Sequence, residues 1–353
     1  MTTTTFEGIT TRTVTTSRLT ANVLERAASG DAESTVVFVH GNVSSSLFWQ
    51  PTMVALPPQV RALAIDLRGF GGSDVLPVDA TRGVRDFSDD VASVLRELGI
   101  ERAHLVGWSM GGGVVLQYLL DNAGSVASVT LVSPVSPYGF GGTAGADGRL
   151  LNEECSGTGG GGANPDFVAR LDAKDVSDEA PTSPRTVYRT GYVKNPDVTA
   201  DLEDLWVESM LTTATGVDNY PGDGSAATNW PGFGPGTHGV LNTMVPRYFD
   251  VSGIVDLESK PSVLWVHGLD DVIVSDTSLF DLNYLGQLGV IPGWPGVEVA
   301  PPQPMVLQTR AVLDRYQDQG GSYREVTFDE CGHSAHLERP DEFMTALVAH
   351  IGS

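Results

Sequence analysis

The sequence is poor in cysteine and in long apolar runs, and each shortage excludes a class of protein. Its 353 residues include only Cys155 and Cys331, whose separation matches no metal-binding or redox motif. We therefore expect two buried free thiols and no need for an oxidising compartment. No apolar run approaches the roughly 20 residues of a membrane-spanning helix, and the N-terminal residues lack the pattern of a signal peptide. These observations favour a cytoplasmic protein with no membrane partner.

The chain is also short of positive charge. Its 21 Lys and Arg residues face 44 Asp and Glu residues, which gives a formal net charge of −23. A surface this acidic repels phosphate groups, so we expect no nucleic-acid partner and no binding to anionic membranes. The hydrophobic content of 41% is typical of a globular protein. The length allows a large core in one or two domains.

Strands and helices alternate in the first part of the chain. Polar and apolar residues alternate along residues 6–30, which predicts two antiparallel edge strands. Continuous apolar runs predict buried strands at 35–40, 60–66, 103–108 and 126–134. A 3.6-residue period predicts an amphipathic helix over 86–101, and a second helix is expected over 111–122. This order predicts an α/β protein whose parallel sheet is covered by helices on both faces.

The alternation stops after residue 135 and resumes near residue 257. We interpret residues 136–256 as an inserted cap, because they hold glycine clusters, proline-rich turns and short helical patterns near 183–193 and 197–214. The core domain would then comprise residues 1–135 and 257–353. Its second part is expected to contain strands at 261–268 and 323–328 and helices at 305–316 and 341–350. A further loop insertion at 285–304 would either cover a pocket or contact another subunit.

The sequence Gly107-Trp108-Ser109-Met110-Gly111 stands between a predicted strand and a predicted helix. This G-x-S-x-G pattern in a strand–turn–helix context projects a serine hydroxyl above a sheet as a nucleophile. A serine hydroxyl needs an adjacent base, and the base needs an orienting acid. Asp270 and Asp271 follow the strand at 261–268, and His333 follows the strand at 323–328. Serine, acid and histidine therefore occur in the order typical of one family of serine hydrolases.

Four motifs make a resemblance to that family specific. They are HGN at 40–42, DLRGFGGSD at 66–74, GWSMGG at 107–112, and the paired loops GLDD at 268–271 and CGHSAHLERPDEF at 331–343. With these motifs the chain resembles the α/β-hydrolase-fold enzymes, in particular the branch of serine esterases, lactonases and perhydrolases. The resemblance covers residues 14–135 and 258–352. It implies a mostly parallel sheet of about eight strands flanked by helices, with an inserted cap.

The resemblance also implies a catalytic triad. Ser109 would be the nucleophile and His333 the general base, because the histidine of the family follows a glycine and His336 does not. Asp271 would be the acid, since it stands three residues after the loop glycine, and Asp270 is the alternative. The arrangement needs no metal and no organic cofactor.

An oxyanion hole needs two backbone N–H donors. The resemblance implies Asn42 and Met110 for this role, with Val43 as the alternative to Asn42. Asp66 and Arg68 are interpreted as residues that tie neighbouring loops together. The run Gly157–Gly162 lacks the ending of a phosphate-binding loop and is read as a cap loop.

Large apolar side chains in the cap and beside the serine are candidates for a substrate pocket. The candidates are Val43, Trp108, Tyr188, Tyr192, Trp206, Met210 and Met244. The cap aromatics could equally form a small core of the cap itself. The histidines outside the triad have no metal-ligand spacing, so no metal site is expected.

The sequence therefore predicts a serine hydrolase for a carboxylic ester or lactone, with a small to medium, mostly apolar substrate. Other reactions remain alternatives, because the same serine is found in carbon–carbon bond hydrolases, perhydrolases, thioesterases and amidases. A protein of another class, a receptor-like binder with slow turnover, would also keep the triad. The oligomeric state is not readable from the sequence.

Overall fold

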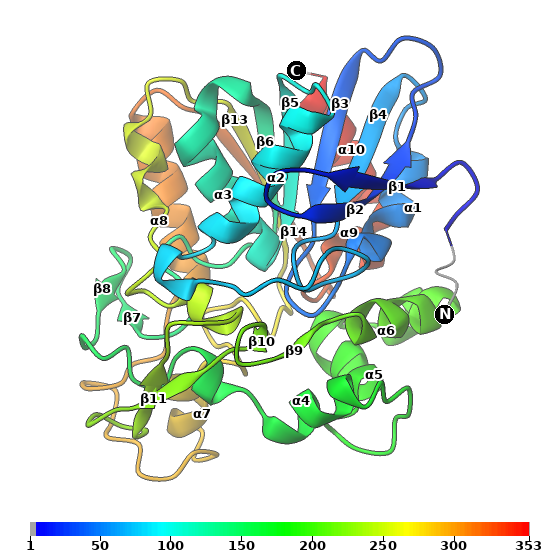
Figure 1. Cartoon of the computed structure of the whole chain (residues 1–353). Helices are drawn as coiled ribbons and strands as arrows, with labels where there is room; N and C mark the ends of the chain where they lie inside the picture. Colours follow the sequence, from blue (N-terminus) through cyan, green and yellow to red (C-terminus); the bar gives the residue numbers. More distant parts are fainter. Residues whose placement is uncertain (1–4, 353) are drawn as a thin grey trace.

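The computed structural model describes residues 5–352, and its centre is an eight-stranded sheet (Figure 1). The strand order is β1-β2-β4-β3-β5-β6-β13-β14; the β1–β2 and β2–β4 pairs at one edge are antiparallel, and the remaining pairs are parallel. The strands are β1 (Thr10–Thr15), β2 (Thr20–Arg26), β3 (Ser34–Val39), β4 (Val60–Ile65), β5 (Ala103–Trp108), β6 (Val126–Val132), β13 (Ser262–Gly268) and β14 (Tyr323–Phe328). The predicted α/β fold with about eight strands is confirmed.

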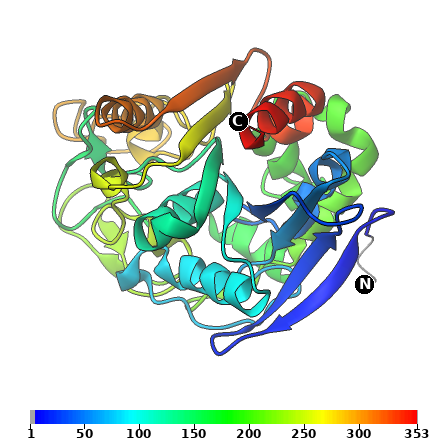
Figure 2. The same cartoon turned by 90° about the horizontal axis from the view of Figure 1, so that it is seen from above.

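Helices cover both faces of this sheet. Seen from above, α2 (Arg85–Glu97), α3 (Met110–Asn122) and α8 (Met305–Asp318) lie on one face (Figure 2). The other face carries α1 (Gln50–Ala55) and α10 (Pro340–Ile351), with the short α9 (Ala335–Glu338) beside them. The predicted period of α2 places Phe87, Val91 and Val94 in the core. The helix ends earlier than predicted because Gly99 turns the chain with a φ of +67°.

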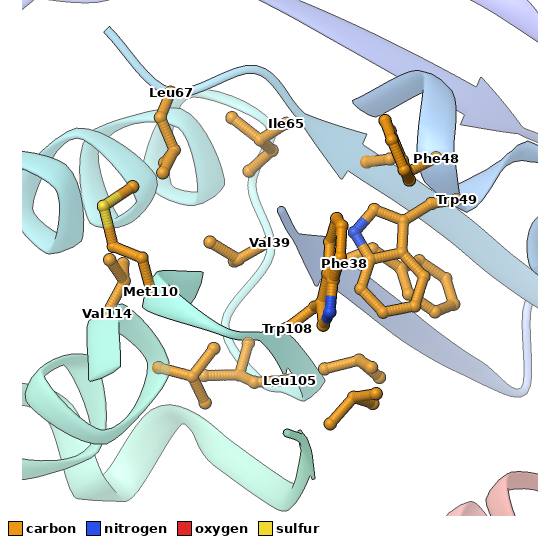
Figure 3. Close-up of a cluster of buried hydrophobic side chains, with 14 of the residues drawn as sticks. Phe38, Val39, Phe48, Trp49, Ile65, Leu67, Leu105, Trp108, Met110 and Val114 are labelled. Atoms are coloured by element: carbon orange, nitrogen blue, oxygen red, sulfur yellow. The ribbon is translucent and has the colours of Figure 1, made fainter. Parts of the chain in front are cut away.

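The core lies between the sheet and these helices (Figure 3). Neighbouring residues of β3 point to opposite faces, so that Phe38 packs on Trp49 with 4.9 Å between ring centroids while Val39 faces the side of Met110. Each large side chain of this kind contributes about 1.5 to 3 kcal/mol when it is fully buried. Cys155 and Cys331 are both buried and unbridged, as predicted. No helix within residues 5–352 has the length and apolar character needed to cross a bilayer.

The segment 136–256, called the cap segment below, contributes no strand to the large sheet. In Figure 1 most of it lies below the sheet, at the edge where β5 and β13 end, while its last residues, 252–256, pack beside α3 and α8. Its helices are α4 (Pro165–Asp172), α5 (Pro184–Val187) and α6 (Glu203–Leu211), and its strands are β7 (Thr143–Ala144), β8 (Arg149–Leu150), β9 (Thr215–Gly216), β10 (Tyr220–Pro221), β11 (Gly224–Ala226) and β12 (Phe233–Pro235). The division into core and cap domains stays a prediction.

The remaining elements are short helices of the π and 3-10 types. A π-helix, η5 (Tyr188–Tyr192), continues α5, and the 3-10 helices are η1 (Ser46–Trp49), η2 (Ala80–Arg82), η3 (Ala123–Ser125), η4 (Gly160–Gly162), η6 (Pro196–Leu202), η7 (Leu241–Met244) and η8 (Ser252–Asp256). The helical pattern predicted at 197–214 corresponds to two consecutive helices, because η6 precedes α6 there. The loop 285–304 begins in α7 (Leu282–Gln287) and contacts the cap segment, because Trp230 Nε1 donates to the Pro292 carbonyl at 3.0 Å.

Candidate active site

Ser109 occupies the turn between β5 and α3. Its φ of +58° and ψ of −121° lie in a region that a serine adopts only under constraint. The constraint is visible, because the Ser109 N–H donates to Val132 O and the Gly112 N–H donates to Ser109 O, each at 2.9 Å. Strained backbone of this kind costs about 1 to 3 kcal/mol and is concentrated at functional sites.

Two glycines make this turn possible. A Cβ on Gly107 would lie 2.3 Å from the Gly111 carbonyl oxygen, and a Cβ on Gly111 would lie 2.4 Å from the Val39 carbonyl oxygen. Atoms that are not bonded cannot approach so closely. The G-x-S-x-G pattern is therefore required by the close approach of β5, α3 and the end of β3.

His333 and Asp271 meet where β13 and β14 end. His333 Nδ1 lies 2.8 Å from Asp271 Oδ2, and both side chains are buried. The second carboxylate oxygen of Asp271 accepts from the N–H groups of Ile273 at 2.8 Å and Val274 at 3.0 Å. A carboxylate at Nδ1 holds the ring proton there, which leaves Nε2 as the basic nitrogen.

The alternative acid and the alternative base lie in other surroundings. Asp270 forms an ion pair with Lys194 at 2.9 Å on the surface. His336 is buried against Trp49, with 4.4 Å between ring centroids, and neither of its ring nitrogens has a hydrogen-bond partner within the described residues. Burial lowers the pKa of His336 to about 3, so this ring stays neutral at neutral pH.

Ser109 and His333 both line a cavity of about 550 Å³. The predicted pocket residues Val43, Trp108, Tyr192 and Met244 line it with them. Further apolar walls come from residues that carried no pocket signal in the sequence: Val135, Phe140, Phe167, Tyr220, Leu241, Ile273, Leu279, Phe280, Leu282 and Leu285. The loop insertion thus reaches the cavity at its first residue.

Three predicted pocket residues lie elsewhere, which corrects that expectation. Trp206 packs on Phe48 of η1, with 5.0 Å between ring centroids, and Tyr188 donates its hydroxyl proton to Thr199 at 2.8 Å. Met210 is fully buried on the same helix as Trp206. Trp206 and Tyr188 lie at the junction between cap segment and core, since both rings lie near Phe48. Helical spacing alone does not say which neighbour a side chain meets.

The turn at 40–43 is the candidate oxyanion loop. The Leu67 N–H donates to His40 Nε2 at 3.0 Å, so the ring proton is on Nδ1, which lies 2.7 Å from the Gly41 carbonyl oxygen. Burial lowers the pKa of His40 and keeps it neutral. Met110 is the first residue of α3, and the first N–H groups of a helix have no partner within it. Met110 with either Asn42 or Val43 therefore remains the predicted donor pair.

Two side chains hold the loop that carries His333. Trp108 Nε1 donates to the His333 carbonyl at 3.0 Å. Glu338 is buried and accepts from the N–H groups of Gly332 at 2.7 Å, Lys194 at 2.9 Å and Asn195 at 2.9 Å. The sequence analysis quoted Glu338 within the histidine motif without giving it a role. A carboxylate five residues after the histidine is the signal that could have found it.

Asp66 and Arg68 tie loops together, as the sequence suggested. Asp66 accepts from the N–H of Ser46 at 2.7 Å and from the N–H of Gly72 at 2.8 Å. Arg68 forms a two-pronged ion pair with Asp90, with contacts of 2.6 and 2.8 Å. Within residues 5–352, no cluster of three or more His, Cys, Asp or Glu side chains is arranged to hold a metal ion.

The chain is similar to one protein family and to several curated proteins over part of its length. Residues 34–146 match a family model described as the alpha/beta hydrolase fold. Over 115 residues the chain is 40% identical to the dihydrolipoyllysine-residue acetyltransferase component of an acetoin cleaving system from Cupriavidus necator, which covers 33% of this chain and 29% of that protein. Over 112 residues it is 31% identical to carboxylesterase YbfK from Bacillus subtilis, covering 31% of this chain and 38% of that protein. The matches thus span about a third of the length of these curated relatives.

Solved structures match over nearly the whole chain. An esterase from Exiguobacterium antarcticum gives a TM-score of 0.59 at 16% identity, covering 98% of this chain and 100% of that one. A 2-hydroxy-6-oxo-6-phenylhexa-2,4-dienoate hydrolase from a Rhodococcus species gives 0.58 at 18% identity, covering 98% and 99%. At this identity the likeness concerns the fold.

Proposed function

Because the chain has the α/β-hydrolase fold, we propose that it is a serine hydrolase that cleaves a carboxylic ester or lactone. One observation carries the proposal. The 2.8 Å contact between His333 Nδ1 and Asp271 Oδ2 leaves a basic nitrogen in the same cavity as the strained Ser109. A relative that is named a carboxylesterase supports the reaction class.

In the proposed mechanism, Ser109 Oγ attacks the carbonyl carbon while His333 Nε2 takes its proton. Asp271 stabilises the imidazolium that forms. The negative charge on the tetrahedral oxygen is held by the N–H of Met110 and that of Asn42 or Val43, each contributing about 3 kcal/mol. His333 then protonates the departing alkoxide, and water activated by the same nitrogen releases the acid from the acyl-enzyme.

The cavity supports a mostly apolar substrate of small to medium size. Its volume of about 550 Å³ lies in the range of small-molecule pockets. Apolar walls such as Phe140, Phe280 and Leu285 favour hydrocarbon groups on either side of the reacting bond. A ring-shaped and a linear ester would both fit this description. The cytoplasmic location of the protein stays a prediction.

The proposal is tested by covalent labelling of Ser109 and by turnover of ester substrates. A fluorophosphonate should label Ser109 in stoichiometric amount, and nitrophenyl esters should be turned over many times per protein molecule. Ser109→Ala should abolish labelling and lower kcat by roughly 10⁴-fold or more. The matched control is Ser133→Ala, since Ser133 directly follows β6, is buried, lies outside the cavity and has no side-chain partner within the described residues.

Three outcomes would contradict the proposal. Full turnover by Ser109→Ala would exclude the serine mechanism. Labelling of Ser109 with at most one turnover would favour the receptor-like alternative. If the protein cleaved a carbon–carbon bond or formed peracids but did not hydrolyse esters, the triad would stand and the proposed ester reaction would be wrong.

A further inference from the structure

Tyr192 connects the cap segment to the candidate oxyanion loop. It is the last residue of η5, it lines the cavity, and it is 7% exposed. Its hydroxyl lies 3.0 Å from the Asn42 carbonyl oxygen and 3.1 Å from the Val43 carbonyl oxygen. One phenol proton is thus shared between two successive carbonyls of a turn about 150 positions away in the sequence.

These contacts set the direction of an N–H group. A trans peptide unit is planar, and its C=O and N–H point in opposite directions. Fixing the Asn42 carbonyl therefore fixes the Val43 N–H. The preceding unit is fixed by the core instead, because the Gly41 carbonyl lies 2.7 Å from His40 Nδ1 and accepts from Ser44 Oγ at 2.8 Å.

The turn needs such a restraint. Val43 has a φ of +47°, in the left-handed region that a β-branched residue rarely adopts. Conformations of this kind persist only where surrounding contacts hold them. The core holds one side of the turn, and the hydroxyl of Tyr192 contacts it from the cap segment.

The position of the Tyr192 ring is itself well defined. The ring meets Trp108 edge-on at 5.7 Å and His333 edge-on at 6.3 Å between centroids. It also contacts Phe48 at 6.1 Å, so it lies between the residue before the nucleophile, the general base and the core. Removal of the hydroxyl alone would leave all of these ring contacts in place.

We propose that Tyr192 is a positioning residue, which holds the turn at Asn42 and Val43 so that the Val43 N–H, the alternative donor to that of Asn42, faces the developing oxyanion. The proposal rests on the proposed serine hydrolase function. Tyr192 acts here on the protein backbone and needs no contact with the substrate. A cap side chain thereby completes the transition-state site, and geometry errors of about 1 Å at such a site can cost on the order of 10²-fold in rate.

The test compares Tyr192→Phe with Tyr188→Phe. Both changes remove one buried phenol hydroxyl from η5, but the hydroxyl of Tyr188 bonds to Thr199 within the cap segment. Active enzyme is counted by fluorophosphonate labelling, and kcat, KM and the pH profile are measured on nitrophenyl butyrate. We expect Tyr192→Phe to lower kcat roughly 10- to 100-fold, with KM and the apparent pKa of the profile unchanged. Tyr188→Phe should stay within about twofold of the wild type.

The same substitution in a protein that also carries Val43→Gly gives a second test. Val43→Gly removes the strain at the positive φ, so the turn depends less on Tyr192, and Tyr192→Phe should cost several-fold less in that background. Equal losses in the two tyrosine variants, a change in KM alone, or an undiminished loss in the Val43→Gly background would each overturn the proposal. A wild-type protein with neither labelling nor turnover would instead show that the proposed function has failed.

Discussion

The sheet core and the cap segment are held together in different ways. The core repeats one rule, in which apolar strands pair through backbone hydrogen bonds and amphipathic helices cover them. The cap segment depends on individual side chains, as where Glu203 of α6 accepts from Arg189 of η5 at 2.7 Å and also pairs with Arg185 of α5. A repeated rule can be read from the sequence, whereas individual contacts cannot.

The same contrast separates chemistry from selectivity. The proposed nucleophile, base and acid stand at the ends of core strands or in the loops after them, where backbone pairing fixes their positions. Most of the apolar cavity wall comes from the cap segment and from the loops after β13. The core therefore carries the proposed reaction, and the cap segment with these loops would select the substrate.

The largest of three further expected effects tests the core side of this contrast. Asp271→Asn should lower kcat by roughly 10³- to 10⁴-fold, because the amide no longer holds His333 in the productive tautomer. Asp270→Asn is the matched control and should stay within about threefold, since it breaks only a surface pair with Lys194. Steady-state kinetics on nitrophenyl butyrate measures both. A larger loss in the Asp270 variant would assign the acid to the other carboxylate.

The next effect tests whether the two regions unfold together. Phe48 is fully buried and packs on Trp108 of the core and Trp206 of the cap segment, with 5.0 Å between centroids in each case. Phe48→Ala should lower the free energy of unfolding by about 3 to 5 kcal/mol, measured by urea denaturation. Phe87→Ala, in α2 on the opposite face of the sheet from α1, removes an equally buried ring and serves as the control. Two separate transitions in the Phe48 variant would show that the cap segment is stable on its own.

The smallest effect concerns the loop insertion and is pH-dependent. Asp281 accepts from the N–H groups of Asn283 at 3.0 Å and Gln303 at 2.8 Å, so it fastens both ends of the loop 285–304. Burial raises the pKa of Asp281 to about 6. A raised carboxyl pKa means that its contribution to stability is complete below the unfolded value and is lost as pH rises through the folded value.

The stability of the wild type relative to Asp281→Asn should therefore fall by roughly 2 to 3 kcal/mol between pH 4 and pH 7. The measurement is urea denaturation of both proteins at several pH values. A difference that stays constant over this range would mean that the carboxyl is solvated and that the loop is held by other contacts.

The sequence was sufficient for the α/β class, the buried strands and the flanking helices, and the family resemblance implied that His333 and Asp271 would meet. These features follow from hydrophobic periods and from loops that all leave one edge of a parallel sheet. The position of Trp206 could not be predicted in this way, because α6 is buried on several sides and its period does not single out one face. The contact of Tyr192 with Asn42 was equally unreadable, since no local pattern connects residues that lie so far apart.

The two cysteines give each region its own reporter of local opening. Cys155 lies in the cap segment and Cys331 lies two residues before His333, and burial raises the pKa of both thiols. A thiol reacts with an alkylating agent only as the thiolate, and only after the structure around it has opened. The ratio of the two alkylation rates would thus show whether the cap segment opens more often than the loop that carries His333. A substrate analogue that closes the cap segment would slow the alkylation of Cys155 more than that of Cys331.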